Sequence, residues 1–294
     1  MSANRTLLDF LPDKGDWDGD YMLVECRRAL SPSSAGPSVQ YALNPYGGCE
    51  HGCVYCYAPG VTHSDPSSWR VVRVKTNIAQ RLTRELPAVS GSTIAVGTVT
   101  DPYQYAERRF LLTRSCLEVI KPERNHVVIL TKSDLVTRDI DVFQRLCPQV
   151  LVTVTGLDDR ASKILEPGAP MPKARLKAVE ELFSEGVDVA VNVSPVTSFL
   201  EGSEEELAEA IAATGVKKVV MDNLDLRHLD VEAMERRRLF PSKKSMEVLK
   251  DQCERRGMVC GPVLSVGAAV QTSLSWEGIR TSIRSTPSGG PRPF

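Results

Sequence analysis

Residues 39–57 read VQYALNPYGGCEHGCVYCY, a short apolar strand followed by a loop that carries three cysteines. Cys49, Cys53 and Cys56 follow the spacing C-x3-C-x2-C, and the glycines beside them allow the tight backbone turns needed to gather three thiols round one centre. Clustered cysteines of this kind indicate a metal site or catalysis. Thiolates favour zinc or an iron–sulfur cluster over hard cations.

Three kinds of site fit this loop. A structural zinc needs four ligands, so His51 or His63 would have to complete the set. A 4Fe–4S cluster held by three thiolates leaves one iron open for chemistry. Three free core thiols are the third interpretation, and their grouping in one glycine-rich loop disfavours it. The spacing therefore favours an iron–sulfur cluster on Cys49, Cys53 and Cys56, with zinc as the alternative.

Composition narrows the class of protein. The chain has 294 residues, 42% of them hydrophobic, and its 36 Lys and Arg against 37 Asp and Glu give a net charge of -1. This balance argues against a dedicated nucleic-acid binder, which usually has a basic excess. No apolar run is long enough to span a membrane, and acidic residues occupy the N-terminal stretch where a signal peptide has its apolar core. We expect a cytoplasmic protein with no membrane partner.

Apolar strands alternate with helical segments from residue 39 onwards. Strands are predicted at 39–43, 93–99, 126–131, 150–155, 187–193, 217–222 and 258–264, and helices at 77–86, 107–120, 138–147, 172–184, 203–213 and 242–256. This alternation indicates a parallel sheet with helical crossovers, and no GxGxxG or Walker motif follows the first strand. The pattern predicts an α/β fold, a partial (β/α)6-type TIM-like barrel over 39–264. An irregular N-terminal arm over 1–38 precedes it, and a C-terminal extension with a flexible tail over 265–294 follows.

Polar residues stand where the predicted strands end, which is the side of a barrel that carries chemistry. They are Asp101, Lys132, Ser133, Thr153, Thr155 and Asn192. Each also has a structural interpretation: a turn-forming Asp, a loop start or β-branched packing. Glu166 and Arg175 either pair with each other or bind a cofactor, since the Arg fork suits a carboxylate.

Four motifs in order extend the cysteine loop into a family pattern. They are ALNPYGGCEHGCVYCYA (42–58), GTVTDPYQ (97–104), TKSDLVTRDIDVF (131–143) and LEP…ARL (165–176). Together they resemble the spore photoproduct lyase-like branch of the radical S-adenosylmethionine (SAM) superfamily, over about residues 37–196. The resemblance implies a full or partial barrel and a 4Fe–4S cluster whose open iron chelates SAM. One electron then cleaves SAM, and the 5′-deoxyadenosyl radical abstracts a hydrogen atom from the substrate.

The resemblance also implies residue roles. It places Tyr55 against the adenine, Lys132 and Ser133 in contact with SAM, Glu166 on the ribose and Arg175 on the carboxylate. The remaining implied cofactor-binding residues are Thr98, Asp101, Thr153, Thr155 and Asn192.

One departure from the lyase pattern bears on the reaction. The lyase has a hydrogen-donating cysteine three residues before an Asp, and Thr98 stands in that position before Asp101. A threonine O–H bond is too strong for this role. We therefore favour a small-molecule or peptide substrate, with a flavodoxin- or ferredoxin-like electron donor. DNA-lesion repair with Tyr103 or Tyr105 as donor is one alternative, and a zinc-stabilised nucleic-acid-binding module is the other.

Overall fold

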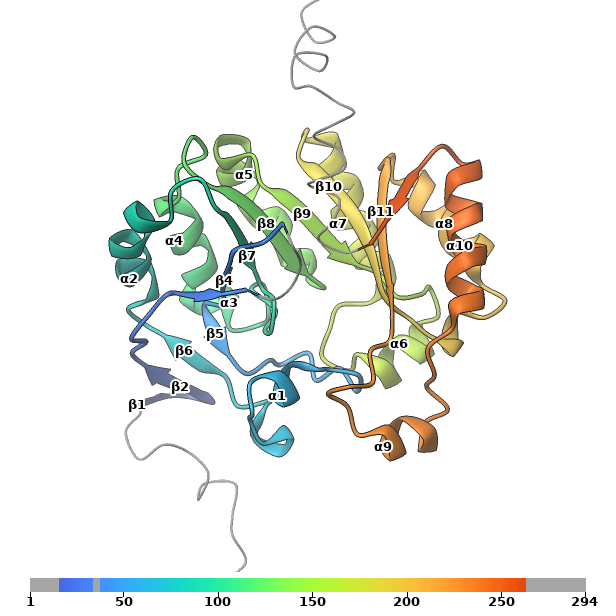
Figure 1. Cartoon of the computed structure of the whole chain (residues 1–294), viewed down its shortest axis with the longest axis horizontal. Coiled ribbons are helices and arrows are strands. Elements are labelled where there is room, and N and C mark those ends of the chain that lie inside the picture. Colours follow the sequence, from blue (N-terminus) through green and yellow to red (C-terminus); the bar gives the residue numbers. More distant parts are fainter. Residues whose placement is uncertain (1–15, 34–37, 263–294) are drawn as a thin grey trace, which may run out of the picture.

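The computed structural model describes residues 16–33 and 38–262, and its centre is a curved sheet with helices on the outer face (Figure 1). The strand order in this sheet is β12-β11-β10-β9-β8-β7-β4-β3, and every neighbouring pair is parallel except β3 with β4. The strands are β3 Leu30–Pro32, β4 Tyr41–Leu43, β7 Thr93–Val96, β8 His126–Thr131, β9 Gln149–Thr153, β10 Asp188–Val196, β11 Lys218–Asn223 and β12 Val259–Gly261.

Helices connect successive strands and cover the outside of the sheet. The α-helices are α1 Ala58–Val61, α2 Ile78–Glu85, α3 Glu107–Phe110, α4 Leu112–Val119, α5 Ile140–Leu146, α6 Asp159–Leu165, α7 Pro172–Ser184, α8 Glu204–Ala213, α9 Val231–Arg236 and α10 Lys243–Arg255. Short 3-10 turns are η2 Pro66–Ser68, η3 Leu86–Val89, η4 Asp134–Asp139 and η5 Ser198–Leu200. Among the described residues, no helix has the length and apolar character to cross a membrane.

Both faces of the sheet are buried, which explains the near-continuous apolar strands. One set of strand residues, including Ile94, Ile129 and Val191, packs in the large cluster that the helices complete. The alternate residues, including Ala95 and Leu151, form a smaller cluster on the opposite face. Since successive side chains of a strand point to opposite faces, the two clusters are the two sides of one sheet.

The sheet remains open, because its two edge strands, β3 and β12, do not pair with each other within the described ranges. The predicted partial TIM-like barrel with parallel strands is thus confirmed. The boundaries at residues 38 and 264 stay predictions, and the tail over 265–294 lies outside the described residues.

Local details differ from the sequence prediction. The described part of the N-terminal arm carries short strands: β1 Asp16–Asp18 and β2 Tyr21–Val24 join β5 Tyr46–Gly47 and β6 Arg73–Lys75 in a second sheet, in the order β1-β2-β6-β5. The helix predicted over 107–120 is two helices, because Leu111 has a positive φ of 52°. The segment predicted as one helix over 138–147 is η4 followed by α5.

Three short helices gather at one end of the barrel (Figure 1). α1 follows the cysteine loop after β4, α6 follows β9, and α9 follows β11, so each comes after the carboxyl end of a strand. Tyr55 from the loop, Leu165 from α6 and Met234 from α9 share one apolar cluster. This packing holds the cysteine loop at the end of the barrel where the other candidate residues lie.

Candidate functional site

The cysteine loop leaves β4 and is fixed by backbone contacts to distant segments. Cys49 N donates to Trp69 O at 2.9 Å, and Val54 N donates to Leu165 O at 2.9 Å. Gly48 has φ of 80°, and a Cβ atom there would lie 2.6 Å from Trp69 O, so only glycine fits this turn. The loop is therefore shaped by its glycine and by its contacts before any metal binds.

The three thiols are close neighbours in a largely buried environment. Cys49 is buried, and Cys53 and Cys56 are partly buried. Burial raises the pKa of Cys49 to about 12, and a negative charge on Cys56 adds to the shift. Burial also raises the pKa of Cys53, with smaller contributions from Cys49 and Cys56. Thiolates in this place need positive charge beside them, which a bound metal centre supplies.

The three thiols do not converge on one ion. Within residues 16–33 and 38–262, no group of three or more His, Cys, Asp or Glu side chains is arranged to hold a single metal ion. The two histidines considered as the fourth zinc ligand lie in different environments. His51 is buried with Nδ1 3.4 Å from Asp101 Oδ2, whereas His63 is exposed.

Asp101 organises the turn after β7. Its Oδ1 accepts from Thr131 Oγ1 at 2.7 Å and from Tyr103 N at 2.9 Å, while Oδ2 accepts from Lys132 N at 2.6 Å. The contact with Tyr103 N is the one expected of a turn-forming Asp. The same carboxylate also joins the ends of β7 and β8 to His51 of the cysteine loop.

Tyr55 contacts both Lys132 and Glu166. The Lys132 ammonium is 5.6 Å from the centre of the Tyr55 ring, and the Tyr55 hydroxyl donates to Glu166 Oε1. Burial alone would lower the pKa of Lys132, but the charges of Cys53 and Glu166 outweigh it and the pKa is raised. Lys132 therefore stays a cation beside the cysteine loop.

Glu166 and Arg175 form an ion pair with each other, which is one of the two arrangements predicted from the sequence. Both side chains are fully buried, with Glu166 Oε2 2.5 Å from Arg175 Nη1. Thr155 Oγ1 donates to Glu166 Oε1 at 3.2 Å, and Arg175 Nη1 donates to Thr153 O at 3.2 Å. Asn192 Nδ2 donates to Thr153 Oγ1 at 2.9 Å, which extends the network to the next strand.

Three buried atoms of this network have no hydrogen-bond partner among the described residues: Glu166 Oε2, which the ion pair with Arg175 engages, and Arg175 Nη2 and Asn192 Oδ1, which nothing engages. Such orphaned groups are uncommon in native proteins and are satisfied in many sites by a ligand or water. The network therefore offers one free donor and one free acceptor.

Thr98 and Ser133 make structural contacts. The Thr98 hydroxyl accepts from Asn44 Nδ2 at 3.1 Å, and its carbonyl accepts from the Tyr57 hydroxyl. The Ser133 hydroxyl accepts from Leu135 N at 3.2 Å and so caps η4. Asn44, which follows β4 directly, was not among the residues predicted from the sequence. Its position at the end of a strand could have identified it.

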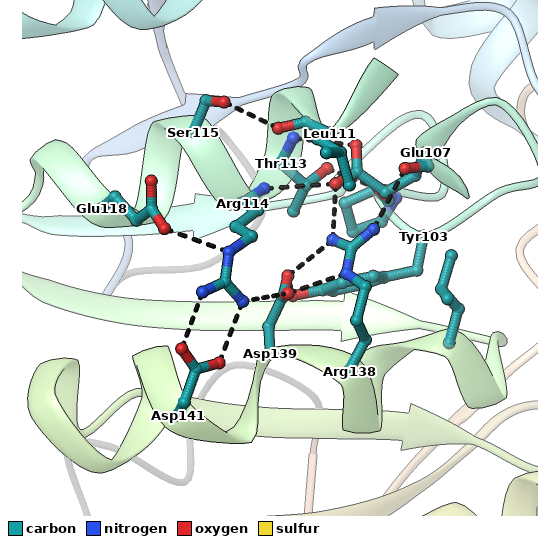
Figure 2. Close-up of polar contacts among 12 residues, drawn as sticks. Tyr103, Glu107, Leu111, Thr113, Arg114, Ser115, Glu118, Arg138, Asp139 and Asp141 are labelled. Carbon is teal, nitrogen blue, oxygen red and sulfur yellow. Dashed lines mark hydrogen bonds and ion pairs between the residues drawn. The ribbon is translucent and has the colours of Figure 1, made fainter. Parts of the chain in front are cut away.

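A second polar cluster joins α3 and α4 to η4 (Figure 2). Glu107 and Asp139 are both fully buried, and Arg138 Nη2 lies 2.7 Å from Glu107 Oε1 and 2.8 Å from Asp139 Oδ2. Tyr103 OH donates to Asp139 Oδ2 at 3.0 Å, while Arg114 Nη1 donates to Asp139 Oδ1 at 3.0 Å. This cluster holds the segment that runs from the Asp101 turn into α3. It also engages the hydroxyl of Tyr103, one of the two residues considered as a hydrogen-atom donor. The other, Tyr105, is 69% exposed.

Two cavities border the site. One of about 530 Å³ lies between α1 and α9 and is lined by Cys56, His63, His228 and Arg237, among others. The other, of about 220 Å³, lies beside β3 and is lined by Arg28, Asn44 and Lys75 together with residues 29–32.

Proteins of similar sequence include ones from bacteria, an archaeon and a virus. An uncharacterized protein of Mycobacterium tuberculosis is 36% identical over 225 residues, which are 69% of this chain and 65% of that protein. One of Methanocaldococcus jannaschii is 31% identical over 178 residues, or 59% of this chain and 66% of its own length. The chain thus spans less than two thirds of the length of these relatives.

Solved structures with a similar fold include spore photoproduct lyase complexed with dinucleoside spore photoproduct, with a TM-score of 0.61, 16% identity and coverage of 81% of this chain and 80% of the lyase. Streptococcus suis SuiB bound to the precursor peptide SuiA has a TM-score of 0.53 and 13% identity, over 81% of this chain and 53% of SuiB. The family model described as the radical SAM superfamily matches residues 43–222, the part that carries the cysteine loop and the strand-end network. The chain belongs to the radical SAM superfamily of enzymes.

Proposed function

We propose that this chain binds a 4Fe–4S cluster on Cys49, Cys53 and Cys56 and binds SAM beside it, and that it acts on a small-molecule or peptide substrate. When bound, the cluster supplies the electron that cleaves SAM, and the resulting 5′-deoxyadenosyl radical removes a hydrogen atom from the substrate. The observation that carries this proposal is the buried network of Tyr55, Lys132, Glu166 and Arg175 directly beside three neighbouring thiols.

The residues present fit such a cluster. Three neighbouring thiols in one buried loop suit a centre in which each thiolate binds a different iron and the fourth iron stays open. A structural zinc would need a fourth ligand, and the buried His51 faces the Asp101 carboxylate, with Nδ1 3.4 Å from Asp101 Oδ2. All eight cysteines are free, and we place the protein in the reducing cytoplasm, where such thiols persist.

The network also fits SAM, which carries both a carboxylate and hydroxyl groups. The free Arg175 Nη2 atom would donate to the carboxylate, and the free Asn192 Oδ1 atom would accept from a hydroxyl or amino group. Glu166 would hold the Arg175 guanidinium in orientation through their ion pair. In this arrangement Glu166 acts as a positioning residue, and its two oxygens are already engaged by Arg175, Tyr55 and Thr155.

The remaining side chains of the site would orient and shield the reacting groups. Asp101 would hold the ends of β7 and β8 at fixed positions through its contacts with Thr131 and Lys132. Cys56 is partly buried and lines the cavity between α1 and α9, so we expect electrons from a flavodoxin- or ferredoxin-like donor to enter at this face. The site around Glu166 and Arg175 excludes water, which would help to hold SAM and the substrate in a fixed orientation for the radical reaction.

Anaerobic reconstitution tests this function. We expect about four irons per chain and, with dithionite, formation of 5′-deoxyadenosine from SAM. The Cys53→Ala variant should lose both. Cys147→Ala is the matched control, since Cys147 is free and exposed, and it should keep both. Absence of iron from the wild type, or iron without SAM cleavage, would contradict the proposal.

A further inference from the structure

The cavity beside β3 contains a lysine, Lys75, that has no acidic partner among the described residues. Lys75 ends β6, is partly buried, and donates from Nζ to Asn44 O at 2.7 Å. Within the part of the chain that the structure describes, Lys75 has no ion pair with a carboxylate. An ammonium has three donors, so the Asn44 carbonyl leaves two of them for water or a ligand.

Two arginines lie near Lys75, while the Cys26 thiol opposes their effect on its charge. Arg28 lines the same cavity and is exposed, and Arg73 lies near enough to disfavour the charge on Lys75. The Glu85 carboxylate does not pair with Lys75 in the described part of the chain: its two oxygens accept from Ala29 N and Leu30 N, which line the same cavity, at 2.9 Å each. A partly buried cation beside further cations is unfavourable unless an anion joins it.

We propose that this cavity is an oxyanion subsite, in which Lys75 and Arg28 bind a carboxylate or phosphate group of the substrate. Its volume of about 220 Å³ is many times the roughly 10–15 Å³ of probe volume that one water needs, so the anionic group enters with part of the molecule that carries it. The Arg28 guanidinium offers a fork that matches either oxyanion, and Lys75 adds a point charge.

The place of the cavity links this subsite to the proposed reaction. β3 is the edge strand of the open sheet, so the cavity borders the opening of the barrel. Asn44 connects the two sites: its carbonyl accepts from Lys75, and its side chain donates to Thr98 at the end of the strand that leads to Asp101. A substrate held by its oxyanion at Lys75 would thus extend past Asn44 toward Thr98. This role as a substrate anchor rests on the proposed function, whereas binding of the anion does not.

Thermal unfolding of the reconstituted protein tests the subsite. Inorganic phosphate and succinate, each at about 20 mM, are compared with potassium chloride at equal ionic strength, because a ligand that binds the native state raises the Tm. We expect at least one of the two oxyanions to raise the Tm by several degrees over chloride. Phosphate alone would identify a phosphate-bearing substrate, and succinate alone a carboxylate-bearing one.

Variants separate the subsite from general salt effects. Arg28→Gln should remove most of the shift, and Lys75→Met should remove it entirely. Arg27→Gln is the matched control, because Arg27 is exposed and does not line the cavity, and it should keep the full shift. Equal Tm values in oxyanion and chloride, or a full shift in Arg28→Gln, would overturn the proposal. Formation of 5′-deoxyadenosine by the same preparation shows separately whether the proposed function holds.

Discussion

Glu166 and Arg175 form a fully buried ion pair, with 2.5 Å between Glu166 Oε2 and Arg175 Nη1. Glu166 follows α6 and Arg175 lies in α7, so the pair joins the two helices that follow β9. The pair also touches Tyr55 of the cysteine loop through Glu166 Oε1. One buried contact therefore couples the loop to the strand-end network.

Breaking this pair should destabilise the fold strongly. Glu166→Gln leaves the Arg175 charge buried without its partner, which typically costs about 3–5 kcal/mol. We expect urea unfolding to report a loss of this order, and the double variant Glu166→Gln/Arg175→Met to lose less than the sum of the single losses. The pair of the half-buried Lys218 and the exposed Asp188 is the control, since Asp188→Asn should change stability by under about 1 kcal/mol. A similar loss in Glu166→Gln and Asp188→Asn would contradict this expectation.

The same pair predicts a pH dependence. Burial alone would raise the pKa of Glu166, but the charges of Arg175 and Lys132 outweigh it and hold the pKa below the ordinary value of 4.5. The folded state therefore binds the proton less tightly than the unfolded state. The stability from Glu166 is present above pH 4.5 and is lost as the pH falls through the folded pKa. Urea unfolding between pH 7 and pH 3 should show the difference between wild type and Glu166→Gln shrinking below pH 4.5, and a constant difference would refute it.

Gly48 should be required for metal loading. In Gly48→Ala the new Cβ meets Trp69 O at 2.6 Å, so the loop must move and the thiols with it. Gly91 is the matched control, because it has a similar φ of 85° and open space around its Cα. Gly91→Ala should cost about 1 kcal/mol for the left-handed backbone and keep the iron. The measurement is the iron content per chain after reconstitution, and Gly48→Ala should lose most of the iron. Normal iron content in this variant would contradict the prediction and show that the loop adapts.

The cluster around Asp139 should stabilise the Asp101 turn (Figure 2). Arg138→Met leaves Glu107 without its ion pair although Glu107 is fully buried, so we expect a loss of about 3–5 kcal/mol. Arg114→Met should lose less, because Arg138 still pairs with Asp139 and the other partners of Arg114 are more exposed. Chemical denaturation of the two variants gives the comparison, and an equal loss would refute this ranking.

Lys75 should react as an amine at lower pH than an ordinary lysine. Burial lowers the pKa of Lys75 below 10.5, so its neutral amine forms at lower pH. Acylation by an amine-selective reagent, followed at Lys75 by mass spectrometry, should have its midpoint below pH 10.5. A bound oxyanion favours the ammonium, so it should move this midpoint upward. A midpoint at or above 10.5 without added oxyanion would show that burial does not govern this group.

Sequence periodicity predicted some elements closely and failed on others for a local reason. The strand predicted at 126–131 and the helix predicted at 172–184 match β8 and α7, since an apolar run and a Pro at the first helical position are local signals. The helix predicted over 107–120 breaks at Leu111. The Glu107 carboxylate accepts from Thr113 N and Arg114 N, which caps α4 after the break, and this geometry has no signal in the apolar pattern.

The sequence by itself determined the family, the alternation of strands and helices, and the three cysteines of the loop, because spacing and periodicity are local properties of the chain. It also placed Asp101, Lys132 and Asn192 at strand ends. Only the tertiary structure decided that Glu166 pairs with Arg175, that Ser133 caps a turn, and that Lys75 donates to the Asn44 carbonyl. Burial and charge partners arise when distant segments pack together, so the environment of each side chain exists only in the folded protein.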